Sequence, residues 1–96
     1  MTDSAVTREL DGSKGRFVLR TEDGEAELTF SVASPTLVIA DHTGVPKALE
    51  GRGLGLRLVE ALVADARANG YRIMPLCPFV NAQRKRHPDW ADVFSV

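Results

Sequence analysis

The chain has 96 residues and a mass of 10.4 kDa, enough for one domain, since single domains cluster around ~100 to 150 residues. Hydrophobic residues make up 44% and charged residues 26% of the chain, a balance typical of a folded globular protein rather than a disordered one. The formal net charge of -1 argues against a nucleic-acid binder, because that function needs a basic surface. The size also excludes large folds that enclose a cofactor.

Charge is distributed unevenly along the chain. Residues 1–48 hold five Lys or Arg against eight Asp or Glu, a net of -3, whereas residues 49–96 hold seven against five, a net of +2. An anionic ligand is therefore expected to bind the second half. A single cysteine forms no internal disulfide, which is typical of a reducing compartment. No stretch approaches the ~18 apolar residues of a membrane span and no signal peptide is recognisable, so we expect a cytoplasmic protein without membrane attachment.

The first half of the chain predicts an antiparallel β-meander. Residues 1–14 have no sustained periodicity and predict a loose N-terminal segment or an edge strand, which leaves 15–96 as the domain proper. Three strands are expected after that segment, joined by turns of the Asp-Gly and Ser-Pro types. They cover residues 16–21, residues 25–32 and residues 36–41. The last of them is apolar on both faces and is expected near the centre of the sheet.

The second half predicts a helix, a strand and a short helix. Apolar residues recur at helical spacing over 56–69, and Asn69-Gly70 is a helix stop. Residues 71–77 predict a fourth strand, although Pro75 offers no amide to a strand ladder. A short helix is expected over 79–86. The whole order predicts an α/β (α+β) fold, in which the meander feeds an α-β-α unit through a parallel crossover.

Three glycines, Gly51, Gly53 and Gly55, separate the third strand from the first helix. Such a turn lets the backbone approach a ligand closely and presents unpaired amides at a helix N-terminus, where the helix dipole favours phosphate. Arg52 and Arg57 would add full positive charges. A tight turn without a ligand explains the same glycines, so the pattern alone leaves both interpretations open. The spacing matches neither a nucleoside-triphosphate loop nor a dinucleotide fingerprint.

Four motifs follow one another along the chain. They are Asp41-His42-Thr43-Gly44-Val45-Pro46, Gly51-Arg52-Gly53-Leu54-Gly55, Leu76-Cys77-Pro78-Phe79-Val80 and Arg86-His87-Pro88-Asp89-Trp90. Together they resemble a short, single-domain subfamily of the GNAT N-acetyltransferase superfamily, over about residues 16–94. The resemblance implies a minimal GNAT-like fold with a splayed pair of parallel strands. It also implies acetyl-CoA as co-substrate, with no metal.

The resemblance assigns the cofactor site to the glycine turn, where backbone amides hold the pyrophosphate. The cofactor-binding residues that it implies are Val45, Arg52, Gly53, Leu54, Gly55, Leu56 and Arg57. Glu50 departs from the family pattern, which prefers Gln or Arg at that position. The backbone from His42 to Val45 is expected to pair with the pantetheine arm. In this arrangement Pro75 lies where its strand diverges from the neighbouring strand, so the backbone at this position needs no hydrogen-bond partner.

Two residues are candidates for catalysis. Cys77 ends the fourth strand just before a helix start, where a thiolate is stabilised; it is expected either to accept the acetyl group or to form a wall of the site, and a buried apolar role is equally open. His42 is expected across the cleft from Cys77, with Asp41 on the opposite face. Histidine's near-neutral pKa suits removal of a proton from an ammonium group, and a structural histidine that bonds a backbone carbonyl is an equally open interpretation. Gly44 and Gln83 stand where relatives carry Glu and Tyr, which weakens the case for catalysis more than that for binding.

The resemblance predicts transfer of an acetyl group from acetyl-CoA to a primary amine, which is a protein lysine, a polyamine or a small amine. A CoA-binding module with little turnover and a non-catalytic interaction domain remain alternatives. Short turns join the early strands, so we expect a shallow acceptor side, suited to a side chain of a larger partner or completed by a second subunit. Both a monomer and a homodimer are compatible with the sequence.

Overall fold

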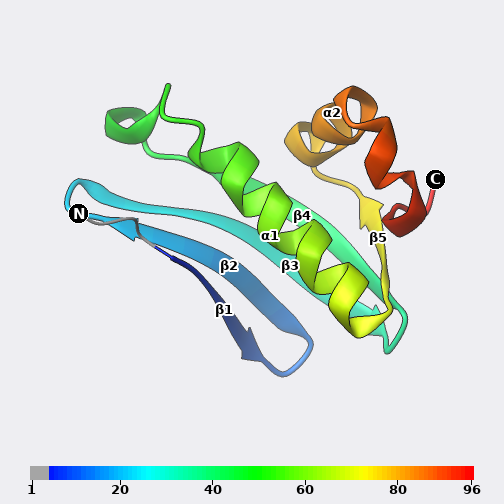
Figure 1. The fold of residues 1–96 in the computed structure, drawn as a ribbon. Coiled ribbons are helices and arrows are strands. Elements are labelled where there is room, and N and C mark those ends of the chain that lie inside the picture. The colour runs from blue at the N-terminus through cyan, green and yellow to red at the C-terminus, as the bar shows by residue number, and fades with distance from the viewer. Residues whose placement is uncertain (1–4) are drawn as a thin grey trace.

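The computed structural model describes residues 5–96, which form one five-stranded sheet with helices packed on it (Figure 1). The strands are β1 (Val6–Asp11), β2 (Lys14–Thr21), β3 (Gly24–Ser34), β4 (Leu37–Gly44) and β5 (Arg72–Pro75). The helices are α1 (Leu54–Asn69) and α2 (Pro78–Arg86), with short 3-10 turns at η1 (Lys47–Leu49) and η2 (Pro88–Val93). The order of strands in the sheet follows the chain from β1 to β5.

The meander and the parallel crossover are confirmed. Strands β1 to β4 pair antiparallel in sequence order, and β4 pairs parallel with β5. Strand β1 occupies the edge of the sheet; residues 1–4, at the start of the segment for which we expected a loose end or an edge strand, lie outside the described residues. No helix within residues 5–96 is long and apolar enough to cross a membrane.

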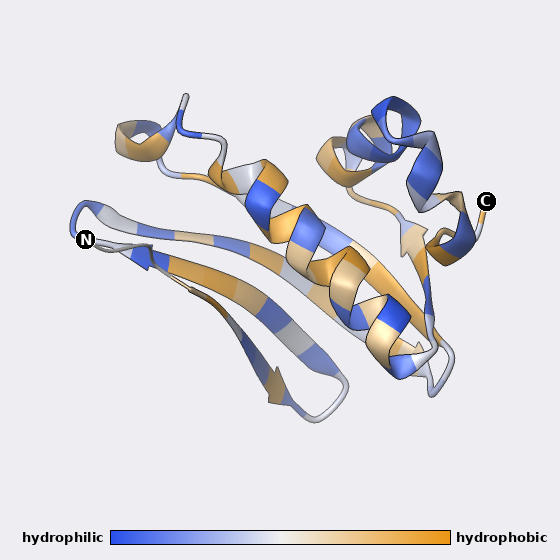
Figure 2. Cartoon of the chain, in the orientation of Figure 1, coloured by the Kyte–Doolittle hydropathy of each residue, from blue (hydrophilic) through white to orange (hydrophobic). Residues whose placement is uncertain are grey.

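The core lies between the sheet and its helices. Apolar side chains alternate along β3, so that one face of this strand is apolar, whereas β2 buries three consecutive apolar residues, Phe17, Val18 and Leu19 (Figure 2). On β3 this face consists of Ala26, Leu28 and Phe30, all buried. Leu58 and Leu62 of α1 pack onto it, and Trp90 of η2 belongs to the same core. The opposite face carries charged and polar side chains, and we call it the open face.

The ends of the elements differ modestly from the sequence expectation. Strand β4 runs to Gly44, three residues beyond the predicted end, because β3 continues to pair with it there. Strand β5 is shorter than predicted and ends at Pro75, which has no amide to continue a ladder. Gly70, in the left-handed conformation with φ 73°, caps the C-terminus of α1 and donates its amide to Ala66.

Candidate functional site

The glycine turn before α1 presents unpaired backbone amides. Gly51 and Gly53 have φ of 83° and 73°, a region that glycine adopts without strain. Gly53 caps α1 without any side-chain hydrogen bond, and the first helical bond runs from Arg57 N–H to the Gly53 carbonyl at 3.2 Å. The amides of the first helical turn therefore have no partner within the helix. The first turn holds no acidic residue, so no carboxylate of that turn neutralises the positive end of the helix dipole.

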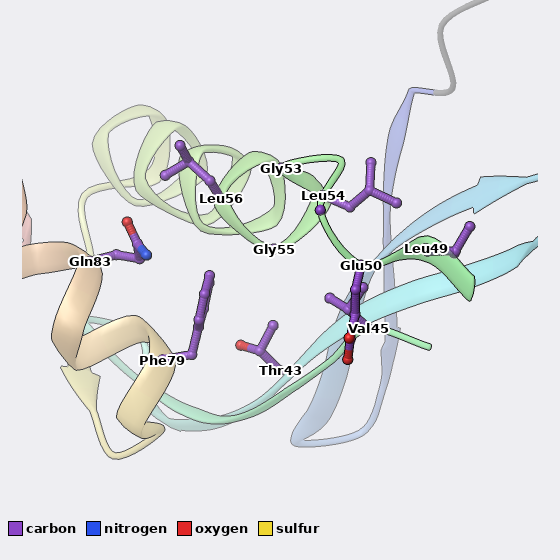
Figure 3. Close-up of a pocket in the computed structure, with 11 residues that line it drawn as sticks. Thr43, Val45, Leu49, Glu50, Gly53, Leu54, Gly55, Leu56, Phe79 and Gln83 are labelled. Carbon is purple, nitrogen blue, oxygen red and sulfur yellow. The ribbon is translucent and has the colours of Figure 1, made fainter. Parts of the chain in front are cut away.

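A cavity of about 510 Å³ opens in front of this turn. Figure 3 shows Phe79, Gln83 and Thr43 bordering the same space as the turn. Its lining residues are Thr43, Val45, Leu49, Glu50, Gly51, Gly53, Leu54, Gly55, Leu56, Phe79 and Gln83. Most of these are apolar or glycine, as in typical small-molecule sites. The Glu50 carboxyl is the lining group that disfavours an anion.

The cavity lies where β4 and β5 separate. Their parallel pairing ends at Ala40 and Pro75, and the last backbone bond between the two segments runs from Cys77 N–H to the Ala40 carbonyl at 2.9 Å. Beyond this point β4 continues to Gly44 beside β3, while the chain after β5 turns away into α2. The backbone of residues 41–44 is thereby released from β5, which agrees with the splayed strand pair expected from the sequence.

A β-bulge in β4 occurs at this point of separation. Phe30 pairs with Ala40 and Thr29 pairs with His42, which leaves Asp41 as an extra residue in β4. Because of this extra residue, the side chains of β4 beyond the bulge change faces. Thr43 lies opposite the buried Leu28, on the side of the helices, and lines the cavity.

The catalytic candidates are arranged differently from the sequence expectation. Thr43 contacts Cys77, with 3.4 Å between Oγ1 and Sγ, whereas His42 lies on the open face opposite Thr29. Asp41 shares this face, because its carboxylate accepts a 2.6 Å hydrogen bond from Ser31. The expectation assumed that successive side chains of β4 point to opposite faces of the sheet, and the bulge at Asp41 interrupts this alternation.

Cys77 precedes α2, as expected, but its side chain is only 2% exposed and it is not among the residues that line the cavity. The Thr43 hydroxyl, which does line the cavity, contacts the thiol. The geometry therefore places Cys77 next to the cavity wall rather than on its surface.

The cofactor residues named from the sequence fall into two groups. Val45, Gly53, Leu54, Gly55 and Leu56 line the cavity. Arg52 and Arg57 are not among its lining residues, and Arg52 forms an exposed ion pair with Asp23 in the β2–β3 turn, at 3.0 Å.

Phe79 and Leu49 line the cavity but were not predicted from the sequence, and Gln83 was predicted only as a departure from the family pattern. Phe79 and Gln83 are four residues apart on α2, so they share one helix face, and this spacing was the available signal. The Phe79 ring packs directly on Gly55: a Cβ at position 55 would lie 2.8 Å from the ring. A glycine at this position therefore lets α2 approach the start of α1.

The profile of a family described as GCN5-related N-acetyl-transferase matches residues 16–93, most of the chain. The chain belongs to the GCN5-related N-acetyltransferase (GNAT) family. A solution structure from Staphylococcus aureus, of a protein described as a GCN5-like candidate N-acetyltransferase, superimposes with a TM-score of 0.72 at 27% identity. The alignment covers 99% of this chain and 91% of that chain. Among curated proteins, no significant match is found. The GNAT fold predicted from the sequence is thus confirmed.

Proposed function

We propose that the protein is an N-acetyltransferase that transfers an acetyl group from acetyl-CoA to a primary amine. The observation that carries this proposal is the joint position of the glycine turn and the strand separation at one cavity. Backbone amides at a helix N-terminus bind phosphate groups. Strand backbone without a partner can pair with the amides of an extended chain such as a pantetheine arm. The cavity offers both, and acetyl-CoA, the usual acetyl donor of the family, contains both chemical groups.

The residues present fit such a ligand. A Cβ at Gly51 or Gly53 would meet nothing within 4 Å, so the outer side of the turn is open to an approaching group. The unpaired amides at the start of α1 would hold the pyrophosphate, and the released backbone of residues 41–44 would pair with the pantetheine amides. When bound, acetyl-CoA supplies the acetyl group and departs as CoA.

The chain's own residues would orient the donor and accept a proton. A C–N bond would form to the amine and the C–S bond to CoA would break. The ammonium gives its first proton to His42 or to solvent before the attack, and the second proton, lost from nitrogen as the amide forms, passes through solvent to the CoA thiolate. His42 suits this role from the open face, because the amine must approach from the side that the donor does not occupy. Alignment of two bound reactants accounts for much of such a rate increase, about 7 kcal/mol or more in favourable cases.

The proposal predicts tight dependence of CoA binding on Gly53. Gly53→Leu places a side chain in the open space before the turn and should lower CoA affinity at least about tenfold, measured by isothermal titration. Gly70→Leu is the matched control, because Gly70 has the same φ of 73° and the same open surroundings at the other end of α1. Both variants carry the same backbone strain, so only a loss confined to Gly53→Leu supports the site. Absence of CoA binding to the wild-type protein would overturn the proposal.

A CoA-binding module with little turnover is the second candidate, favoured by Gln83, which is buried at 8% exposure in the cavity wall where an ionisable tyrosine would serve as an acid. Release of free CoA thiol in the presence of amines distinguishes the two. An enzyme releases it in proportion to acetylated amine, whereas a binding module binds CoA without release.

A further inference from the structure

A second hollow, of about 400 Å³, adjoins the cofactor cavity. Its lining residues are Glu25, Glu27, Gly44, Val45 and Pro46. Val45 lines both spaces, which therefore lie on either side of this residue. Glu25 and Glu27 are on the open face of β3, so this hollow lies on the side of β4 away from the helices. Gly44 belongs to the part of β4 that no longer pairs with β5, so the hollow lies beside the strand separation, on the side opposite the donor cavity.

The absence of a side chain at Gly44 keeps this hollow open. A Cβ at position 44 would lie 3.7 Å from Nε2 of His42 and 3.9 Å from Cγ of Glu27. Glu27 is the cross-strand partner of Gly44. An imidazole and a carboxylate side chain thus flank one point, and a larger residue at position 44 would fill the space between them.

The charges beside the hollow do not cancel. Arg16 donates to Glu9, Glu25 and Glu27 at 2.8 to 3.2 Å. Arg20 donates to Glu9 and Glu25 at 2.9 and 3.1 Å. Two guanidinium groups therefore face three carboxylates, which leaves one negative charge in excess. The side chains of Glu25 and Glu27 remain 44% and 35% exposed, so a ligand can reach them, and the excess charge favours a cation.

We propose that this hollow binds the acceptor and selects a primary amine that carries a second positive charge. The inference rests on the proposed function and specifies its acceptor. The second charge binds at Glu25 and Glu27, which directs the reacting nitrogen past Gly44 to the region of His42 and the strand separation. A free aliphatic diamine and a lysine beside another basic residue both present this chemistry.

The experiment compares 1,4-diaminobutane with 1-aminobutane, which share the reacting group and differ in the second charge. In the wild-type protein kcat/KM for the diamine should exceed that for the monoamine about fivefold or more, the usual effect of one partly exposed charge pair. Glu27→Gln should bring the ratio close to one, mainly through KM. Glu60→Gln is the matched control, since it removes the same charge from α1, on the other side of the sheet, and Glu60 does not line this hollow; it should leave the ratio unchanged.

A binding measurement keeps the inference separate from turnover. In amide NMR spectra of the CoA-saturated protein, 1,4-diaminobutane should shift Glu27 and Gly44, and Glu27→Gln or the space-filling Gly44→Leu should abolish the shifts. If these shifts occur but no amine is acetylated, the proposed function fails and the amine site stands. Equal rates for both amines together with no shifts would overturn the site. Lysine peptides flanked by Arg or by Ser, assayed in parallel, tell whether the acceptor is a protein side chain.

Discussion

At the scale of single residues, the position of Cys77 bears most directly on the route of the proposed acetyl transfer. Its thiol is buried, and Thr43, which lines the cavity, contacts it at 3.4 Å. A nucleophile must reach the carbonyl carbon, and this arrangement favours direct transfer to the amine over a covalent acetyl-cysteine. Cys77 then supports Thr43 from behind, as a small apolar group does.

We therefore expect Cys77→Ala to retain turnover within about threefold, at a stability cost on the order of 1 kcal/mol for the lost sulfur. Steady-state rates of CoA release, with urea denaturation alongside, measure both effects. Intact-protein mass spectrometry after exposure to acetyl-CoA should detect no acetylated protein. An acetyl adduct in the wild-type protein that is missing from Cys77→Ala, together with a loss of turnover, would establish the covalent route instead.

The sequence predicted individual residues well where alternation holds and poorly where it is interrupted. The alternation of residues 25–32 predicts one apolar face of Ala26, Leu28, Phe30 and Val32; the first three are buried, and Val32 is partly buried against the same core. His42 was expected across the cleft from Cys77 with Asp41 on the opposite face, but both lie on the open face because Asp41 is an extra residue in β4. A bulge depends on the pairing of two strands, and neither strand alone contains that information.

At the scale of elements, β2 contains a glycine, Gly15, whose role depends on its contacts with the two neighbouring strands. Gly15 lies between the edge strand and β3, and the Phe30 ring packs against its backbone. A Cβ at position 15 would be 2.4 Å from Cζ of that ring and 2.7 Å from the Glu9 carbonyl oxygen. The strand was predicted to begin at Arg16, whereas β2 begins two residues earlier, at Lys14, and includes this glycine.

Gly15→Ala should lower the free energy of unfolding by about 1 to 3 kcal/mol, because the methyl group overpacks against a backbone atom as well as a ring. Chemical denaturation followed by the fluorescence of Trp90, the single tryptophan, measures this. Gly44→Ala in β4 is the control, since its new Cβ would make only contacts of 3.7 Å or longer. Equal stability of the two variants would show that the sheet relaxes around residue 15.

The identity and order of the elements followed from the sequence, since periodicity and turn residues are local. The separation of β4 from β5 was expected only through the family resemblance. The geometry of this separation depends on the residues at which the parallel hydrogen bonds between β4 and β5 end. Pro75 was the local sign of that stop, because it has no amide to donate.

At the scale of the whole molecule, ion pairs connect distant segments and make stability depend on pH. The guanidinium groups of Arg20 and Arg16 lower the pKa of the Glu9 carboxyl, and Arg67 lowers that of Asp92. Arg67 joins α1 to η2, donating to Asp92 at 2.8 Å and to the Asp89 carbonyl. The two carboxyl groups take up protons less readily in the folded protein than in the unfolded chain.

Stability from these pairs is therefore present above the ordinary carboxyl pKa range, about 4 to 4.5, and is lost as the pH falls below that range through the lowered pKa values of the folded protein. Urea midpoints at pH 7, 5, 4 and 3 should decline over the last two steps. Arg67→Gln should reduce the part of that decline due to Asp92. The pairs are exposed, so each effect is small and should weaken with added salt. A midpoint that stays constant down to pH 3 would contradict this account.

The strand β4 has a helix-side cavity on one face and an open hollow on the other, and Val45 borders both. On the proposed assignment, donor and acceptor reach the reaction centre from opposite directions. Neither substrate covers the other's approach, so the protein needs no obligatory order of substrate addition, and CoA can leave while the acetylated product is still bound. β4 thus lies between the two substrates, and each of them diffuses to and from its own side of this strand.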